Sequence, residues 1–177
     1  YEEAAIYAEW SEYLITKLKY INHNFTILLE RIGIFYTTIG NLQKALSYFE
    51  QYNALGKKLY HKYSKDVNLK NGLAISYQKL GEIHISLGNL KKALHFFEQY
   101  NNLEKELYDK YPKNVEFKNN LAISYDKLGS THISLGNLQK ALHFFEQYNN
   151  LEKELCDKYP KNISCLLYTS DAADEWL

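Results

Sequence analysis

An eight-residue motif, Leu-Gly-Asn-Leu-x-Lys-Ala-Leu, recurs in this chain at a constant interval. It occupies 39–46, where isoleucine replaces the first leucine, and again 87–94 and 135–142. The surrounding residues repeat as well, since 73–114 and 121–162 differ at only five of 42 positions. A fixed period of this size is typical of a solenoid of stacked helix pairs. The repeat therefore predicts an all-α solenoid of antiparallel helix hairpins. Solenoids expose long surfaces, so this fold favours binding over catalysis.

Each unit predicts two helices separated by a Gly-Asn turn. In the last unit the first helix is expected over about 115–135, and Gly136 suits the left-handed position just past a helix end. Asn137 can cap the second helix, which is expected over about 138–158, and Pro160 follows where a helix cannot comfortably continue. Apolar residues in this second helix recur at spacings of three and four, which indicates one stripe on a helix.

This pattern of helices and turns resembles the tetratricopeptide repeat. The family pattern of an aromatic residue, Leu-Gly, an aromatic, Gly, Ala, an aromatic and a turn proline falls on Tyr77, Leu80, Gly81, His84, Gly88, Ala93, Phe97 and Pro112. His84 and His132 stand where the family usually has tyrosine, which Tyr36 supplies in the first unit. Since the family unit has 34 residues, each helix here is expected to be longer by about two turns. The resemblance implies a right-handed superhelix of helix pairs.

The repeat spacing divides the chain. We expect an array over 1–162, made of a partial repeat and three units at 1–24, 25–72, 73–120 and 121–162. Because the chain has no methionine and starts inside an expected helix, we interpret it as an internal fragment. Residues 163–177 depart from the repeat. The stretch Cys165–Glu175 resembles a translated sequencing-adapter scar, which would be a non-native tail; the alternative is a genuine divergent capping helix, which solenoids need.

The composition argues against several classes of partner. Lys+Arg and Asp+Glu both number 21, which disfavours a nucleic-acid footprint or a polybasic membrane surface. No apolar run approaches the length of a membrane span, and no signal peptide is visible. Cys156 replaces a tyrosine of the preceding unit, so we interpret it as drift and not as half of a disulfide. We expect a cytoplasmic protein with no nucleic-acid or membrane partner.

The side chains that could carry chemistry are explained by the repeat. His84 and His132 are expected to fill packing positions, with His95 and His143 facing solvent, because a spacing of eleven does not bring two imidazoles to one metal. The 17 tyrosines and 8 phenylalanines follow helical spacing, which favours core packing over base stacking. The acidic residues fall on solvated helix faces. We therefore predict no enzyme, no metal and no cofactor.

The resemblance also implies where a partner binds. In the family the first helix of each pair lines a concave groove. Carried over residue by residue, the groove positions are Ile27, Glu30, Arg31, Ile34, Thr37, Ile75, Gln78, Lys79, Glu82, Ile85, Ile123, Asp126, Lys127, Ser130 and Ile133.

One internal comparison supports this groove. Three of the five differences between the two similar units lie at 78, 82 and 83, and residues 78 and 82 are one helical turn apart. A face that varies on a fixed scaffold is typical of a binding face, although drift at exposed sites is an alternative. The family's lysine and asparagine clamp for a C-terminal carboxylate is missing: its lysine is replaced by Glu30, Gln78 and Asp126, and its asparagine by Ile34, Glu82 and Ser130.

The sequence therefore favours a protein–protein interaction scaffold whose groove holds a mixed-charge peptide or an amphipathic helix. The alternative is a regulatory or sensor arm of a larger enzyme or signalling protein, such as a caspase-like peptidase, a kinase or an NTPase. A purely architectural spacer stays open. We also expect uncovered apolar stripes at the array ends to permit end-to-end self-association.

Overall fold

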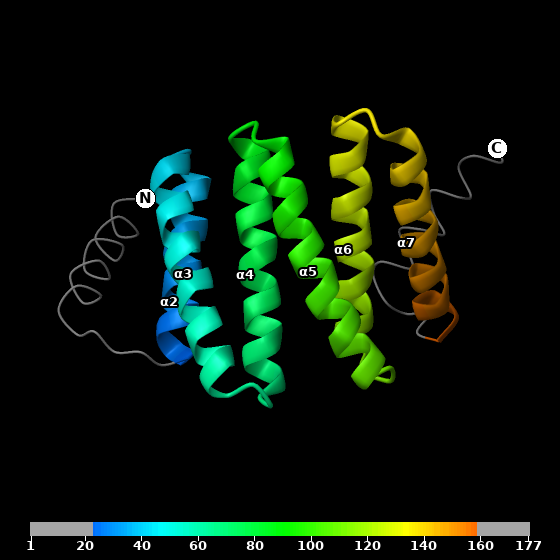
Figure 1. Ribbon diagram of the computed structural model, residues 1–177, viewed down its shortest axis with the longest axis horizontal. Helices are drawn as coiled ribbons and strands as arrows, with labels where there is room; N and C mark the ends of the chain where they lie inside the picture. The colour runs from blue at the N-terminus through cyan, green and yellow to red at the C-terminus, as the bar shows by residue number, and fades with distance from the viewer. Residues whose placement is uncertain (1–22, 159–177) are drawn as a thin grey trace. The chain divides into compact units, whose positions relative to one another are not determined.

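The computed structural model describes residues 23–158, and all the regular structure in this range is α-helical (Figure 1). The helices are α2 (His23–Thr38), α3 (Leu42–Lys62), α4 (Val67–Ser86), α5 (Leu90–Lys110), α6 (Val115–Ser134) and α7 (Leu138–Lys158). The predicted all-α helical repeat is confirmed, and the helices expected over 115–135 and 138–158 agree with α6 and α7 within one residue. The chain divides into two compact units whose boundary lies between Leu103 and Glu104, inside α5.

The Gly-Asn turn ends each first helix by the same local hydrogen bonds. In α4 the N–H of Gly88 donates to Ile85 and the N–H of Asn89 donates to the carbonyl of His84. This pair of hydrogen bonds requires a residue in the left-handed region of backbone conformation, and Gly88 has a φ of 73°. Gly40 and Gly136 repeat the conformation. The predicted role of these glycines in ending the helices is confirmed.

Polar side chains fix the helix starts. Asn41 accepts from the backbone N–H of Lys44 at the start of α3. Asp66 and Asn114 do the same at α4 and α6, where each side chain accepts two backbone N–H groups. Each cap satisfies donors that a helix start leaves without partners, at a gain of about 1 kcal/mol. In α4 and α6, therefore, local sequence sets both the start and the end of the helix.

In the unit that contains α2, α3 and α4, the middle helix packs against both of its neighbours. Its buried face includes Tyr48, Phe49, Tyr52 and Leu59. Two hydrogen bonds join it to α4: the Tyr52 hydroxyl donates to the carbonyl of Gly72 at 2.9 Å, and Asn53 donates to the Ser76 hydroxyl at 2.8 Å. These contacts hold α2 and α4 on one scaffold, and α2 also touches α4.

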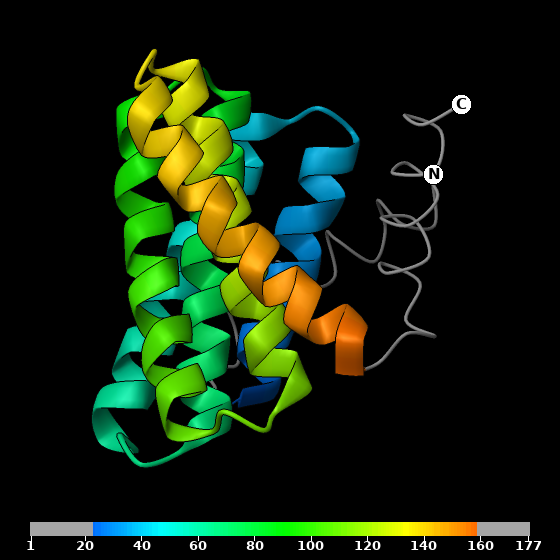
Figure 2. The same ribbon diagram turned by 90° about the vertical axis from the view of Figure 1, so that its right-hand side faces the viewer.

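In the other unit α6 and α7 form a hairpin, and Figure 2 shows the two helices lying side by side. Phe117, Leu121 and Leu128 of α6 are buried, as are Ala141 and Leu155 of α7. A further finding corrects the sequence interpretation of Cys156, because this residue is disulfide-bonded. Because disulfides are rare in the reducing cytoplasm, Cys156 does not support a cytoplasmic location.

The division of the chain into a partial repeat and three units stays a prediction. Most of the partial repeat expected at 1–24, and all of the tail at 163–177 with its adapter-like stretch, lie outside the described residues. The right-handed winding of the array likewise stays a prediction.

The buried histidines occupy packing positions, as predicted. His84 and His132 are each 4% exposed and stack face to face on Phe96 and Phe144, with ring centroids 5.4 and 5.5 Å apart. His95 and His143 are exposed. In the first unit Tyr36 takes the corresponding place and stacks on Tyr48.

His84 gives the protein a testable pH dependence. Burial lowers the pKa of His84, Lys92 lowers it further, and Glu50 opposes them. Below about pH 6.5, the ordinary value for histidine, the unfolded chain therefore binds a proton that the folded protein does not. The stability that neutral His84 contributes is present above about pH 6.5 and is lost as the pH falls from there toward the lowered pKa.

We expect His84→Tyr, which copies Tyr36, to reduce this acid sensitivity. Urea denaturation of the variant and the parent protein at about pH 7.5 and about pH 5.5 measures it. His95→Tyr, at an exposed position, is the control and is expected to leave the pH dependence unchanged. An identical loss of stability on acidification in the parent and in His84→Tyr would contradict the assignment.

Candidate peptide-binding face

The fifteen predicted groove residues lie on α2, α4 and α6, and none of them is buried. Four of their isoleucines are exposed: Ile27 at 38%, Ile34 at 42%, Ile85 at 39% and Ile133 at 52%. Ile75 and Ile123 are half-buried, as are six of the polar positions, namely Glu30, Gln78, Lys79, Glu82, Asp126 and Lys127. Large apolar side chains that recur on one helix type while exposed to water mark a surface with capacity for a partner.

A hollow of about 210 Å³ lies between α2 and α4 on this face. We call it the α2–α4 hollow. It is lined by Ile34, Thr37, Thr38, Phe49, Lys79, Glu82, Ile83 and Ser86. Four of these, from both helices, are predicted groove residues: Ile34, Thr37, Lys79 and Glu82. The structure thus brings together side chains that belong to successive repeats and lie far apart in the sequence.

The floor of the hollow is apolar. Phe49 is 3% exposed and Ile83 is 1% exposed, so both present only a small part of their surface to the hollow. Phe49 can lie this deep because it packs against Gly33, where an added Cβ would lie 2.5 Å from the ring. The floor therefore depends on a helix-to-helix approach that only glycine permits.

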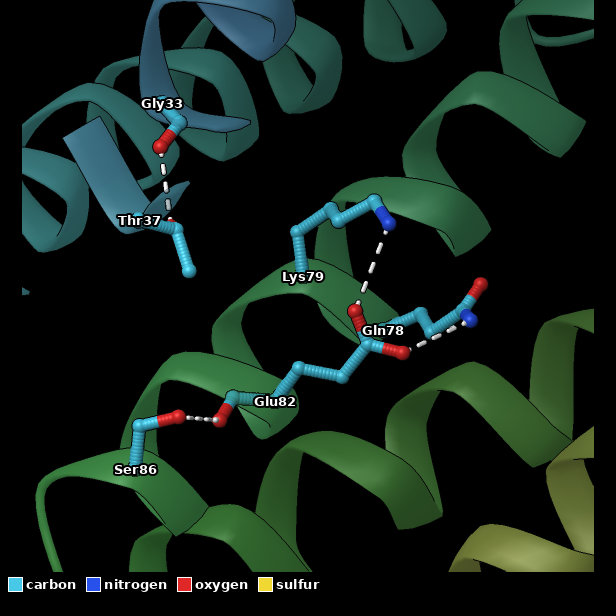
Figure 3. Close-up of polar contacts among 6 residues, drawn as sticks. All are labelled: Gly33, Thr37, Gln78, Lys79, Glu82 and Ser86. Carbon is cyan, nitrogen blue, oxygen red and sulfur yellow. Dashed lines mark hydrogen bonds and ion pairs between the residues drawn. The ribbon is translucent and has the colours of Figure 1, made fainter. Parts of the chain in front are cut away.

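The rim of the hollow is polar. Glu82 accepts from Gln78 Nε2 at 3.1 Å and from Lys79 Nζ at 3.3 Å, both on its own helix (Figure 3). Thr37 donates its hydroxyl proton to the carbonyl of Gly33 at 2.9 Å, and Ser86 donates to the carbonyl of Glu82 at 3.2 Å. Since both partners of the Lys79–Glu82 pair are partly exposed, the pair contributes less than about 1 kcal/mol to stability. Its main effect is to fix the carboxylate in place.

Four lining residues are not among the predicted groove positions: Thr38, Phe49, Ile83 and Ser86. A signal was available for three of them. Thr38 and Ser86 occupy the same position in successive repeats, and both carry a hydroxyl that bonds to the carbonyl four residues earlier. Ile83 was itself one of the five differing positions, where α6 has Thr131. Phe49 gave no such signal, because its place depends on packing.

The third unit presents different chemistry at the same positions. Asp126, Ser130 and Thr131 of α6 replace Gln78, Glu82 and Ile83 of α4. The hydroxyl of Thr131 donates to the carbonyl of Lys127 at 2.7 Å. Among residues 23–158, no group of three or more His, Cys, Asp or Glu side chains is placed to hold a metal ion. In the same range no helix is both long and apolar enough to cross a membrane.

Comparison with known proteins agrees with this architecture. Residues 74–106 and 122–154 match the sequence profile of the tetratricopeptide repeat. A search of curated proteins finds no match. Among solved structures, the fold is similar to that of BtubC (BKLC) from P. vanneervenii, with a TM-score of 0.69 at 13% identity over 84% of this chain and 56% of that one. The chain therefore spans little more than half the length of BtubC.

Two further solved structures match with lower TM-scores. One is a putative kinesin light chain with nearly identical TPR-like repeats from Podosopora anserina, at 15% identity and a TM-score of 0.40, covering 90% of this chain and 89% of that one. The other is MamA from Desulfovibrio magneticus RS-1, at 16% identity and a TM-score of 0.35, covering 87% and 97%. The profile match over these two stretches agrees with the predicted resemblance to the tetratricopeptide repeat and suggests a protein-interaction scaffold.

Proposed function

We propose that this chain is a scaffold that binds a mixed-charge peptide or an amphipathic partner helix through the groove residues predicted on its first helices. The observation that carries the proposal is the α2–α4 hollow, which is lined by predicted positions from two successive first helices. A hollow that combines an apolar floor with a few fixed polar groups is the usual composition of a binding site. Its volume suits one side chain of a partner, since pockets for whole small molecules run from about 300 Å³ upward.

Affinity for such a partner comes mainly from apolar burial. Ile34 and Ile85 are 42% and 39% exposed, so a partner that covers them removes apolar surface from water. Each square ångström removed is worth about 25 cal/mol. The charged groups beside them, including Arg31 and Lys79, then set the register of the partner and its association rate more than its affinity.

The test uses peptides selected from a random displayed library on the intact chain. We expect Ile34→Asp to weaken the selected peptides by about tenfold or more, the loss typical of a residue at the centre of an interface. Ile39→Asp is the matched control, because Ile39 is 45% exposed but lies in the turn after α2 and outside the groove positions. It is expected to change affinity by less than about twofold.

A second variant tests the charged part of the face. The double substitution Glu30→Lys and Asp126→Lys reverses one acidic residue in each of two units, and we expect weaker binding of peptides that carry basic residues. Circular dichroism confirms that each variant keeps its helical content. Folded variants that bind the selected peptides as tightly as the parent protein would refute the groove. End-to-end self-association and a cytoplasmic location stay predictions.

A further inference from the structure

We infer that the α2–α4 hollow takes a basic side chain of the partner, an arginine or a lysine. Its alkyl stem would lie on the apolar floor, and its N–H groups would donate to the acceptors at the rim. This inference rests on the proposed function, because it names the partner group that this part of the face accepts.

The hydroxyl groups at the rim are committed as donors. Thr37, Thr38 and Ser86 each give their single proton to the backbone carbonyl four residues earlier, at 2.9, 3.0 and 3.2 Å. A hydroxyl has one proton and two acceptor lone pairs. Once the proton is used inside the helix, the oxygen can offer only lone pairs to a bound group. Three residues from two helices thus present acceptors to the same hollow.

The carboxylate adds a fourth acceptor and a negative charge. Glu82 is half-buried at the rim and is oriented by Gln78 and Lys79 (Figure 3). An ionised carboxylate accepts hydrogen bonds only, and it can serve several donors at once. Bonds from an arginine or a lysine to a carboxylate are about twice as strong as bonds between neutral groups.

Few of the side chains that line the hollow can donate a hydrogen bond to a ligand. Among its lining side chains, Lys79 is the one group that keeps protons for a ligand, and it is already bonded to Glu82. A partner carboxylate would gain this single cation but would lie against Glu82 and the three hydroxyl oxygens. A partner cation instead meets acceptors from both helices, although it must share Glu82 with Lys79. The acceptor count favours the cation.

The apolar floor selects a long basic side chain over a small donor. Phe49, Ile83 and the exposed Ile34 line the hollow below the polar rim. Arginine and lysine bury their methylene stems along apolar surface while their charged heads stay near water. On α6 the equivalent positions carry Ser130 and Thr131, so this carboxylate is not repeated there. The preference for a basic side chain of the partner is therefore expected at the α2–α4 hollow.

The experiment determines which peptides the chain selects and which groups they need. Peptides are selected from the random displayed library on the intact chain, and those whose binding is lost with Ile34→Asp are kept. We expect them to share an arginine or a lysine. Glu82→Gln is expected to weaken them about tenfold, and so is replacing the shared basic residue with alanine. The two losses should not add when combined, because both remove one contact.

One control and one further variant accompany Glu82→Gln. Glu98→Gln removes one carboxylate from the exposed surface of α5, outside the groove positions, and is expected to change affinity by less than about twofold, which separates a local contact from net charge. Thr37→Val keeps the side-chain shape, removes one acceptor, and is expected to weaken binding several-fold. It provides a second test if Glu82→Gln alters the fold.

The outcomes distinguish this inference from the proposed function. The inference would be overturned, and the groove left intact, if the peptides that depend on Ile34 lack a shared basic residue. The same holds if they bind Glu82→Gln and Thr37→Val as tightly as the parent protein. If no selected peptide depends on Ile34, the proposed function fails and the inference fails with it. Both the inference and the proposed function would be supported by peptides that depend on Ile34 and share a basic residue, if the loss on replacing that residue does not add to the loss from Glu82→Gln.

Discussion

Replacing Gly81 with alanine is expected to destabilise the protein by about 2 kcal/mol, although alanine is the better helix former. Gly81 lies inside α4, where it faces the ring of Phe97 on α5. An added Cβ would lie 2.3 Å from Cε1 of that ring and within 2.7 Å of two more ring atoms. Phe97 is 1% exposed and so has no room to withdraw. Overpacking of this kind costs about 1–3 kcal/mol or more, and the helix propensity of alanine returns at most about 1 kcal/mol.

Gly56 is the matched control for this substitution. It also lies inside a helix, α3, and is also buried, but a Cβ there would lie 3.6 Å from Leu73, an ordinary contact. Gly56→Ala is therefore expected to leave stability unchanged or to raise it by up to about 1 kcal/mol. Urea denaturation followed by circular dichroism measures both variants.

A second substitution identifies the cause. If the clash with the ring is responsible, Phe97→Leu should cost less in the Gly81→Ala background than in the parent protein, because the smaller side chain relieves the contact. Additive losses would place the cause elsewhere. The same close approach recurs at Gly33 with Phe49 and at Gly129 with Phe145, so the result bears on the floor of the α2–α4 hollow as well.

The helix ends could be predicted from the sequence because the information is local. Gly88 and Asn89 act through backbone bonds within one turn, so a short motif is enough to place the end of α4 and the start of α5. The repeat then carries the same bounds to the other hairpins. The buried places of His84 and His132 followed for a similar reason, because the family's aromatic position sits at a fixed distance from the turn.

The pairwise contacts could not be predicted in the same way. That Gly81 faces Phe97 depends on how two helices approach, which the positions of the two residues in the repeat do not state. The α2–α4 hollow has the same character: its predicted members were known from the first-helix pattern, but Phe49 joins it from α3 only through packing. Thr38 and Ser86 were overlooked because hydroxyls near a helix end look like ordinary surface residues until the neighbouring helix is placed.

A hydrogen bond between helices supplies the largest expected effect. Asn53 of α3 is 4% exposed, and its side-chain amide donates to the Ser76 hydroxyl of α4 at 2.8 Å. Ser76 is fully buried and gives its own proton to the carbonyl of Leu73 at 2.7 Å. The Ser76 oxygen can therefore only accept, and Asn53 must be a donor. A carboxylate at position 53 would have no proton to give and would be buried against an acceptor.

We expect Asn53→Asp to destabilise the protein by about 3 kcal/mol at neutral pH, because it buries an unpaired charge. Asn149 is the matched control. It occupies the same position two repeats later, on α7, but it is exposed, so Asn149→Asp is expected to change stability by less than about 0.5 kcal/mol. Asn53→Leu separates the loss of the hydrogen bond from the cost of the charge.

The pH dependence provides the decisive reading of this variant. Burial beside acceptors raises the pKa of the introduced carboxyl group in the folded state above its unfolded value of about 3.9. The folded protein therefore holds a proton more tightly than the unfolded chain, and the stability deficit shrinks as the pH falls through the raised pKa. A protonated carboxyl group can donate to the Ser76 oxygen as the amide does. Urea midpoints measured between about pH 7 and pH 4 should converge with those of the parent protein. A deficit that is small at pH 7, or that does not narrow on acidification, would show that the Asn53–Ser76 bond does not hold α3 against α4 in the way described.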